Sequence, residues 1–403
     1  MYDKLATWID THFDEEVAFL RELVRVPTDT PPGDNAPHAE RTAVLLEARG
    51  FEVERHAVPA ALVREHGLKS ITNLVVRQTF GAGPTIALHA HGDTVPAGHG
   101  WTKPPYEGVI EDGRMYGRGV AVAKSDFATY TFALRALRAV PGNLVGTIEL
   151  HFTYDQEYGG GLGPAWLLRN GVTKPDLAIG AGFSYEIVTA HNGCLQLEVT
   201  LHGKAAPAAL PEHGIDALYG AMSVMEALYA ERARYVQQAV GKACPTINIG
   251  RIEGGTQTNV VPDRVTLRID RRIVPEENPA EVEHRLRQVI EQAAGIRAGL
   301  RVDVRRLLLA RPLAPAAGQQ RLVRPLKHHA ATFFGEEIAA GASPHYTDGR
   351  LYAEAGVPIV LYGAGPRSAA EANAQGADEN LLLDDLRRAT KVVTCTLCDL
   401  LAR

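Results

Sequence analysis

Two residues capable of chemistry stand close together in the first quarter of the chain. His91 and Asp93 are separated by one glycine in the segment L-H-A-H-G-D-T-V-P, directly after an apolar stretch at residues 85–90. An imidazole and a carboxylate are both side chains that can bind a metal ion. Side chains at the carboxyl end of a strand converge on a crevice, where open α/β sheets place their chemistry. Alone, the pair would be interpreted as a hydrogen-bonded loop pair; together with the motifs that follow it, it indicates half of a metal site.

The stretches around this pair indicate which elements position it. Apolar runs typical of buried strands alternate with segments of helical periodicity. Strands that are apolar on both faces predict a largely parallel sheet covered by helices on both sides, an α/β architecture. The predicted strands lie at residues 71–76, 85–90, 146–153, 176–179 and 357–362, and the principal helices at 125–139 and 383–401.

The pattern changes near Ala190, where strands begin to alternate apolar and polar residues. Leu195, Leu197 and Val199 alternate with polar residues, as in a strand with one face in water. The order of elements that follows is β-α-β-β-α-β, the split βαβ arrangement. We predict a small α+β domain at residues 190–309, inserted into a larger α/β domain formed by residues 1–189 and 310–403.

Composition and charge narrow the classes of partner and compartment. A formal net charge of -5 gives no basic field for a phosphate backbone, so nucleic acid is not an expected partner. No run approaches the about 20 apolar residues that span a membrane. The first residues do not resemble a secretory signal, and we expect a cytoplasmic protein. Cys395 and Cys398 lie within the predicted final helix and are interpreted as buried thiols rather than a redox or metal pair.

Several longer motifs together carry a resemblance to a known family. They are H-G-D-T-V-P, D-G-R-M-Y-G-R-G, T-Y-D-Q-E-Y-G-G, L-H-G-K-A-A and N-V-V-P-D-R-V-T-L-R-I-D-R-R. In these motifs the chain resembles the zinc aminoacylase, acetylornithine deacetylase, succinyl-diaminopimelate desuccinylase and glutamate carboxypeptidase family, which are co-catalytic zinc hydrolases. The resemblance covers nearly the whole length. It implies a zinc-exopeptidase-like large domain, a ferredoxin-like lid at 190–309, and a homodimer formed through that lid.

The resemblance also assigns roles to individual residues. In the family, two zinc ions share a bridging aspartate, and a glutamate acts as general base on the bridging water. His91 matches a histidine ligand of one zinc, and Asp93 matches the aspartate that orients it. Glu157 matches the carboxylate ligand of the other zinc.

Five other positions depart from the family pattern. Val122 stands where the bridging aspartate is expected, and Gln156, an amide, stands where the general base is expected. Gly182, Gln375 and Pro207 replace a carboxylate ligand, the late histidine ligand and the lid histidine, respectively. Each metal position then keeps about one good ligand, whereas zinc sites normally use three or four protein donors. We expect no resident cofactor; the surviving donors would support only weakly bound zinc.

Several remaining polar residues are candidates for catalysis or binding. Lys124 follows the lost bridging acid, and we hypothesise that it pairs with Glu157 or Asp155 and replaces some of the lost positive charge. We therefore class it with Asp93 and Gln156 as a candidate catalytic position.

A second group of candidates concerns the substrate. Asn259 and Arg272 match lid residues that hold the substrate carboxylate, and an arginine fork suits bidentate carboxylate binding. Gly363 and Gly365 match a glycine turn that lines the cleft. His345 is a further candidate for binding or for base catalysis, and Cys194 for a nucleophile, although their spacing supplies no partner for either.

Three functions follow from these residues. The first is a hydrolase of this ancestry that acts on an N-acyl amino acid or a dipeptide-like carboxylate by an altered, metal-independent route. The second is a non-catalytic dimeric protein that binds a small carboxylate. The third is a metallohydrolase with substitute ligands such as His89, His99, His151 or His345. Metal content and turnover distinguish them.

Overall fold

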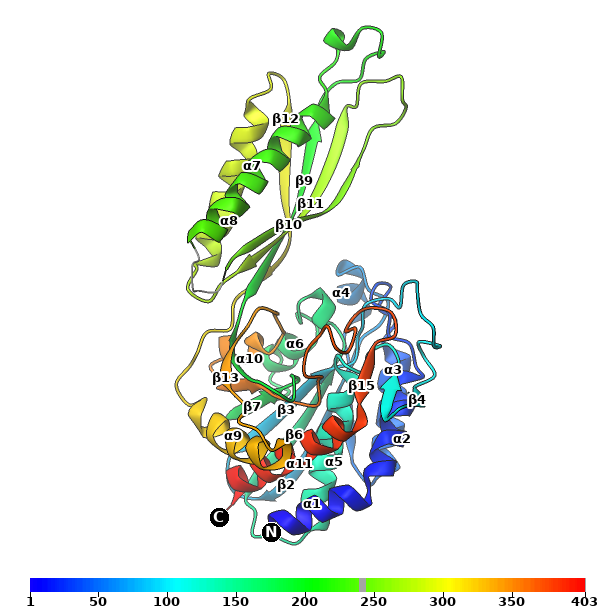
Figure 1. The fold of residues 1–403 in the computed structure, drawn as a ribbon, viewed down its shortest axis with the longest axis vertical. Coiled ribbons are helices and arrows are strands. Elements are labelled where there is room, and N and C mark those ends of the chain that lie inside the picture. The colour runs from blue at the N-terminus through cyan, green and yellow to red at the C-terminus, as the bar shows by residue number, and fades with distance from the viewer. Residues whose placement is uncertain (239–243, 403) are drawn as a thin grey trace. The chain divides into compact units, whose positions relative to one another are not determined.

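A computed structural model describes residues 1–238 and 244–402. The chain divides into two compact units (Figure 1). The larger unit comprises residues 1–189, 315–342 and 347–403, and the smaller unit comprises residues 190–314 with 343–346. The two units are described separately below.

The main sheet of the larger unit is parallel at its centre and antiparallel toward its edges. Strands β6, β3, β7 and β14 run parallel, which is the α/β arrangement expected from the apolar runs. Strands β1 and β2 on one side, and β8 on the other, pair antiparallel. Within the described residues the strands follow the order β1 (Val53–Ala57), β2 (Thr72–Gly81), β6 (Gly146–Thr153), β3 (Thr85–His91), β7 (Leu177–Gly180), β14 (Ile359–Leu361), β8 (Ile187–His191) and β13 (Ala340–Ser343).

Helices cover this sheet and a small second sheet joins it. Helix α11 (Leu383–Leu401) packs on α9 (Gln320–Phe334), α5 (Lys124–Ala139) and α1 (Tyr2–Thr11), as Figure 1 shows. The second sheet has the order β15 (Asn380–Leu382), β5 (Arg114–Tyr116) and β4 (Val109–Glu111). The remaining helices of the unit are α2 (Phe13–Val24), α3 (Ala36–Glu47), α4 (Ala60–Glu65), α6 (Pro164–Arg169) and α10 (Arg350–Glu354).

The predicted elements next to the chemistry correspond closely to the structure. Helix α5 occupies the stretch expected at 125–139, and the final helix has the expected bounds. Cys395 and Cys398 are buried free thiols on α11, as predicted. Among the described residues, no helix combines the length and apolar character that crossing a membrane requires.

The smaller unit has the split βαβ arrangement predicted from the sequence. Its antiparallel sheet has the order β10-β11-β9-β12, and α7 and α8 lie side by side on one face (Figure 1). The elements are β9 (Gly193–His202), α7 (Ala217–Gln238), β10 (Thr246–Gly254), β11 (Arg264–Ile273), α8 (Pro279–Gly295) and β12 (Arg301–Ala310). The alternating residues of β9 that were expected to face inward are buried in the core of this unit.

The boundary expected at residue 309 requires a correction. Strand β12 continues to Ala310, which pairs with Cys194 in β9. The smaller unit therefore extends to Ala314 and also includes Ser343–Tyr346. A sequence pattern places a strand but not the last residue that its partner strand holds, because ladder pairing is not visible in the sequence.

A buried glutamate in the larger unit makes its stability depend on pH. Glu16 is fully buried, and one of its carboxyl oxygens accepts a hydrogen bond from Thr390 Oγ1 at 2.6 Å, while the other has no partner in the structure. Burial raises the pKa of Glu16 from 4.5 to about 8. The folded chain therefore holds this proton up to about pH 8, whereas the unfolded chain releases it near pH 4.5. The free energy of unfolding must fall as the pH rises through this window.

The variant Glu16→Gln removes this pH dependence because an amide does not ionise. We expect the variant to be more stable than the natural chain by about 2–4 kcal/mol at pH 8, and equally stable near pH 4.5, since one pKa unit corresponds to about 1.4 kcal/mol. Urea unfolding followed between pH 4.5 and 8.5 measures the difference. The exposed Glu52→Gln is the control. A constant difference between Glu16→Gln and the natural chain across this range would contradict the prediction.

Candidate functional site

The structure brings the two polar segments of the sequence together at the carboxyl ends of neighbouring strands. His91 is the last residue of β3, and the parallel pairing of β3 with β6 places it beside Thr153. Three residues after Thr153, a single 3-10 turn, η1 (Gln156–Tyr158), carries Gln156 and Glu157. The strand register therefore places these two segments next to each other.

Asp93 holds both segments. Its carboxylate lies 3.3 Å from His91 Nδ1 and accepts the backbone N–H groups of Gln156 at 3.2 Å and Glu157 at 2.9 Å. Both His91 and Asp93 are fully buried. Burial alone lowers the pKa of His91, but the hydrogen bond and the charge of Asp93 outweigh burial and raise the pKa to about 9. Asp93 thus orients the histidine as the sequence predicts.

The side chain of Gln156 contacts the second ring nitrogen of His91, Nε2. The amide nitrogen of Gln156 lies 2.9 Å from His91 Nε2, and the amide oxygen lies 3.5 Å from the backbone nitrogen of Asp348. A neutral ring protonated at Nδ1 accepts a hydrogen bond from the amide at Nε2, whereas a protonated ring donates to the amide oxygen after the amide turns over. In either state, the nitrogen that a metal ion would require is already engaged.

Gln375 contacts Glu157 in a corresponding way. Its side-chain amide donates a hydrogen bond to Glu157 Oε1 at 3.1 Å. Burial and the nearby Asp93 raise the pKa of Glu157 to about 7, although the hydrogen bond from Gln375 acts in the opposite direction. The two residues that match metal ligands, His91 and Glu157, are therefore each in contact with a glutamine that stands at a substituted family position.

Two of the positions that lost their ligands, Gly182 and Val122, bring no donor atom of their own to the site. At Gly182, an added Cβ would lie 2.8 Å from the backbone nitrogen of Tyr362 and 2.9 Å from the carbonyl carbon of Leu361, so this backbone has no room for a side chain. Val122 offers no donor atom. Among the residues that the structure describes, no group of three or more His, Cys, Asp and Glu side chains is placed to hold a metal ion. The residues present do not fit the two zinc ions that the resemblance implies.

Lys124 does not pair with Glu157 or Asp155, and this hypothesis is wrong. Its Nζ donates hydrogen bonds to the backbone carbonyl of Val26 at 3.0 Å and to that of Leu23 at 3.3 Å. The side chain is fully buried, and burial lowers its pKa to about 7. Two main-chain carbonyls at the end of α2 lie within reach of the amine and accept its hydrogen bonds in place of a carboxylate.

Asp126 is a site residue that the sequence did not reveal. It lies in the first turn of α5, it is fully buried, and its Oδ1 accepts the backbone N–H of Ala364 at 2.7 Å. Burial raises the pKa of Asp126 to about 7, and His91 is close enough to oppose that shift by its charge. An aspartate at the start of a helix ordinarily indicates only a favourable helix dipole, so its position beside the glycine turn carried no sequence signal.

The glycine turn that includes Gly363 and Gly365 is shaped by this carboxylate. A Cβ on Gly363 would lie 1.9 Å from Asp126 Oδ1, and a Cβ on Gly365 would lie 2.7 Å from the Gly182 carbonyl oxygen. The backbone N–H of Gly365 also donates to the Gly182 carbonyl, and the Gly365 carbonyl accepts the backbone N–H of Ser184. The requirement for glycine at both positions follows from these close approaches, and their role in substrate binding stays a prediction.

The remaining candidates lie in the smaller unit. Arg272 is fixed by Asp270, whose carboxylate accepts from its Nε at 2.8 Å, and the guanidinium lies 5.4 Å from the ring centroid of Tyr346. Asn259 is exposed on a loop. Burial lowers the pKa of His345, and the charge of Arg272 adds to this effect. The positions suit carboxylate binding by Arg272, which stays a prediction.

Cys194 is poorly suited to act as a nucleophile. Its thiol is fully buried and donates to Asp270 Oδ2 at 3.2 Å. Burial and the charge of Asp270 raise its pKa to about 12. Because the thiolate is the reactive form, a thiol with this pKa is inert near neutral pH.

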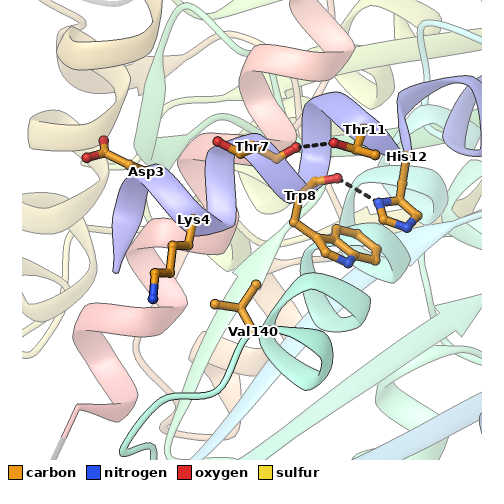
Figure 2. Close-up of a pocket in the computed structure, with 7 residues that line it drawn as sticks. All are labelled: Asp3, Lys4, Thr7, Trp8, Thr11, His12 and Val140. Atoms are coloured by element: carbon orange, nitrogen blue, oxygen red, sulfur yellow. Dashed lines mark hydrogen bonds between the residues drawn. The ribbon is translucent and has the colours of Figure 1, made fainter.

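A hollow lined by residues of α1 and by Val140 lies apart from this chemistry. Figure 2 shows its lining, in which His12 bonds the carbonyl of Trp8 and the two rings stack with centroids 3.9 Å apart. The cavity volume is about 430 Å³. Its lining residues are Asp3, Lys4, Thr7, Trp8, Thr11, His12 and Val140. None of them belongs to the strand-end segments described above.

Comparison with known proteins places the chain in a family. The model of peptidase family M20/M25/M40 matches residues 87–399. The chain belongs to this family. It is 31% identical over 271 residues to acetylornithine deacetylase from Salmonella arizonae, covering 64% of this chain and 68% of the relative. It is 28% identical over 299 residues to succinyl-diaminopimelate desuccinylase from Rhodospirillum centenum, covering 70% of this chain and 73% of the relative.

Solved structures, one of them described as an M20-family enzyme, show the same fold. Human carnosine dipeptidase 1 superposes with a TM-score of 0.80 at 18% identity, covering 99% of this chain and 98% of the other. An M20 metallo-carboxypeptidase from Sulfolobus solfataricus superposes with a TM-score of 0.76 at 20% identity, covering 95% and 98%. The family and fold that the sequence motifs indicated are therefore confirmed. The chain keeps the M20 architecture while Gln156 and Gln375 contact its two retained ligand-position residues.

Proposed function

We propose that this M20-family protein acts on N-acyl amino acids or dipeptide-like carboxylates without the two-metal machinery of the family. The substrate class is suggested by the relatives, a deacetylase, a desuccinylase and a dipeptidase, whose names describe cleavage of acyl or peptide amides. The metal-independent route is supported by one observation above all: the Gln156 amide engages His91 Nε2 at 2.9 Å.

Arg272 and Asn259 are proposed to bind the carboxylate of the ligand. Asp270 fixes the orientation of the Arg272 guanidinium, and a guanidinium held in place loses little entropy when it binds a carboxylate. This part of the proposal does not depend on whether the amide bond is cleaved.

The test is turnover of a panel of N-acetyl and N-succinyl amino acids and dipeptides after exhaustive dialysis against a chelator. We expect hydrolysis to continue in the dialysed protein, and added zinc, manganese or cobalt to leave the rate unchanged within about twofold. Activity that vanishes with the chelator and returns with metal would contradict the proposal.

A second candidate function is binding of the same carboxylates without turnover. It is favoured by Gln156, because an amide at the general-base position does not accept a proton from water. Calorimetric binding of N-acyl amino acids, together with no hydrolysis in the panel, would support this function over the first.

We further propose that the chain forms a homodimer through residues 190–309, as the family resemblance implies. The support is a row of exposed apolar side chains on α7, where Met222 is 53% and Tyr229 is 49% exposed. The row comprises Leu218, Tyr219, Met222, Tyr229 and Val236. An apolar helix face of this kind is typical of a protein interface.

The dimer is tested by mass in solution. We expect light scattering to give a mass of two chains for the natural protein and of one chain for Met222→Glu/Tyr229→Glu, because each charge would have to be buried unpaired. Val44→Glu, on an exposed residue of α3, is the matched control and should stay dimeric. A single-chain mass for the natural protein would exclude the dimer.

A further inference from the structure

Gln156 and Gln375 share a feature that their separate positions in the sequence do not suggest. Each stands where the family pattern requires a residue of the metal chemistry, and each bonds one of the two surviving ligand-position residues. Gln156 contacts His91 at 2.9 Å, and Gln375 donates to Glu157 at 3.1 Å. Each substituted residue therefore contacts one of the residues that would bind a metal ion in the family pattern.

These contacts join three segments that approach one another at the carboxyl ends of the strands. His91 ends β3, η1 follows β6, and Gln375 lies in the loop that leads to β15. A metal ion shared by ligands from such segments would cross-link them. Here, side-chain amides make the cross-links, and an amide suits both partners because it can donate to a carboxylate or to a ring nitrogen.

The backbone of Gln375 indicates that its placement is specific. Its φ of 62° lies in the left-handed region, which non-glycine residues rarely adopt. The carbonyl of Gln375 accepts from Arg118 Nη2 at 3.2 Å, and Arg118 is itself buried against Glu379. Such a disfavoured conformation persists where the surroundings hold it, and it is found at functional sites. In this chain it accompanies the side-chain amide that reaches Glu157.

We propose that Gln156 and Gln375 are positioning residues that replace the metal ions as cross-links of this site, holding His91 and Glu157 in place in a metal-free protein. The proposal rests on the metal-independent function proposed above. It adds which residues hold the site together when no metal ion is bound. The proposal excludes a divalent cation such as zinc as a ligand of this site.

The first test restores the metal-binding residue types. The variant Val122→Asp/Gln156→Glu/Gln375→His supplies the bridging acid, the general-base glutamate and the late histidine that the family pattern contains. We expect zinc to raise the melting temperature of this variant by at least 5 °C and to leave that of the natural chain unchanged within 1 °C. Val122→Asp/Gln156→Glu/Gln78→His, which moves only the histidine to strand β2, is the matched control and should not respond. An equal zinc response of the natural chain, or no response of the folded triple variant, would overturn the proposal.

The second test does not require the triple variant to fold. Gln375→Ala, Glu157→Ala and the double variant form a cycle that isolates the contact between the two side chains. We expect the pair to change the unfolding equilibrium constant about fivefold to tenfold beyond the product of the single effects, as for one ordinary hydrogen bond in a protein. Additive single effects would overturn the cross-link.

The outcomes separate this proposal from the function on which it rests. Coupling between Gln375 and Glu157 with no turnover in the chelated panel keeps the cross-links and refutes the hydrolase. Metal-independent turnover with additive effects keeps the hydrolase and refutes the cross-links.

Discussion

Replacement of Arg118 by methionine is expected to lower the free energy of unfolding by about 3–5 kcal/mol, because it leaves a buried carboxylate without its partner. Arg118 and Glu379 are each 1% exposed and their side chains meet at 2.5 Å. The second oxygen of Glu379 accepts backbone N–H groups of Gly119, Ala121 and Val122. The loss would therefore release the loop that carries Val122 as well as the ion pair.

Two further variants make this prediction specific. Arg251→Met removes an exposed pair with Glu253 and should cost less than about 1 kcal/mol, as surface ion pairs do. Arg118→Met/Glu379→Gln removes both charges and should recover part of the loss, because a neutral amide is cheaper to bury than an unpaired charge. Urea unfolding measures all three variants. A loss below 1 kcal/mol for Arg118→Met would contradict the assigned role of the pair.

The variant Gly363→Ala is expected to cost about 3 kcal/mol or more. The added methyl group would lie 1.9 Å from Asp126 Oδ1 and 2.6 Å from Asp126 Cγ, so the buried carboxylate would have to move. Moving it would break its hydrogen bond to the Ala364 backbone. Overpacking in a core typically costs about 1–3 kcal/mol, and the lost hydrogen bond adds to this.

The double variant Gly363→Ala/Asp126→Ala identifies the cause of that loss. If the clash is with the carboxylate, the double variant should be more stable than Gly363→Ala alone, although Asp126→Ala by itself removes a hydrogen bond. Gly341→Ala is the control for a glycine-to-alanine change without a clash, because an added Cβ there meets nothing within 4 Å. Equal instability of the single and double Gly363 variants would show that the backbone, and not Asp126, requires glycine.

Much of the fold was predictable because it follows from local patterns of apolar and polar residues. The apolar runs gave the parallel strands β3, β6 and β7, and the alternation in β9 indicated a sheet with one wet face. These patterns reflect which faces of a strand or helix are buried, because buried positions carry apolar residues. The antiparallel edge strands and the end of β12 at Ala310 depend on pairing between distant segments, which no local pattern records.

The site was predictable in its framework but not in its contacts. His91, Asp93 and Glu157 were found because they sit at strand ends within recognisable motifs. The partners of Gln156 and Gln375 were not predicted, since a sequence shows that a ligand is lost but not what its replacement touches. Lys124 was assigned the wrong partners for the same reason: charge balance is a property of the whole site, and two carbonyls near the end of α2 satisfied the amine instead.

Asp126 illustrates a different limit. Nothing in the residues around it distinguishes an aspartate that caps a helix from one that supports a turn 238 positions later in the chain. Its burial and its contact with Ala364 emerge only when α5 and the segment after β14 are packed together. Residues of this kind carry no short-range signal, because their function is defined by tertiary contact alone.

The central claim is that this M20 site is held together by its own side chains and not by metal ions. The most direct test is the metal content of protein produced in zinc-supplemented medium and purified without any chelator, measured by mass spectrometry of the elements. The account predicts far less than one zinc, manganese, cobalt or iron ion per chain. A content close to two metal ions per chain, retained through gel filtration, would contradict it.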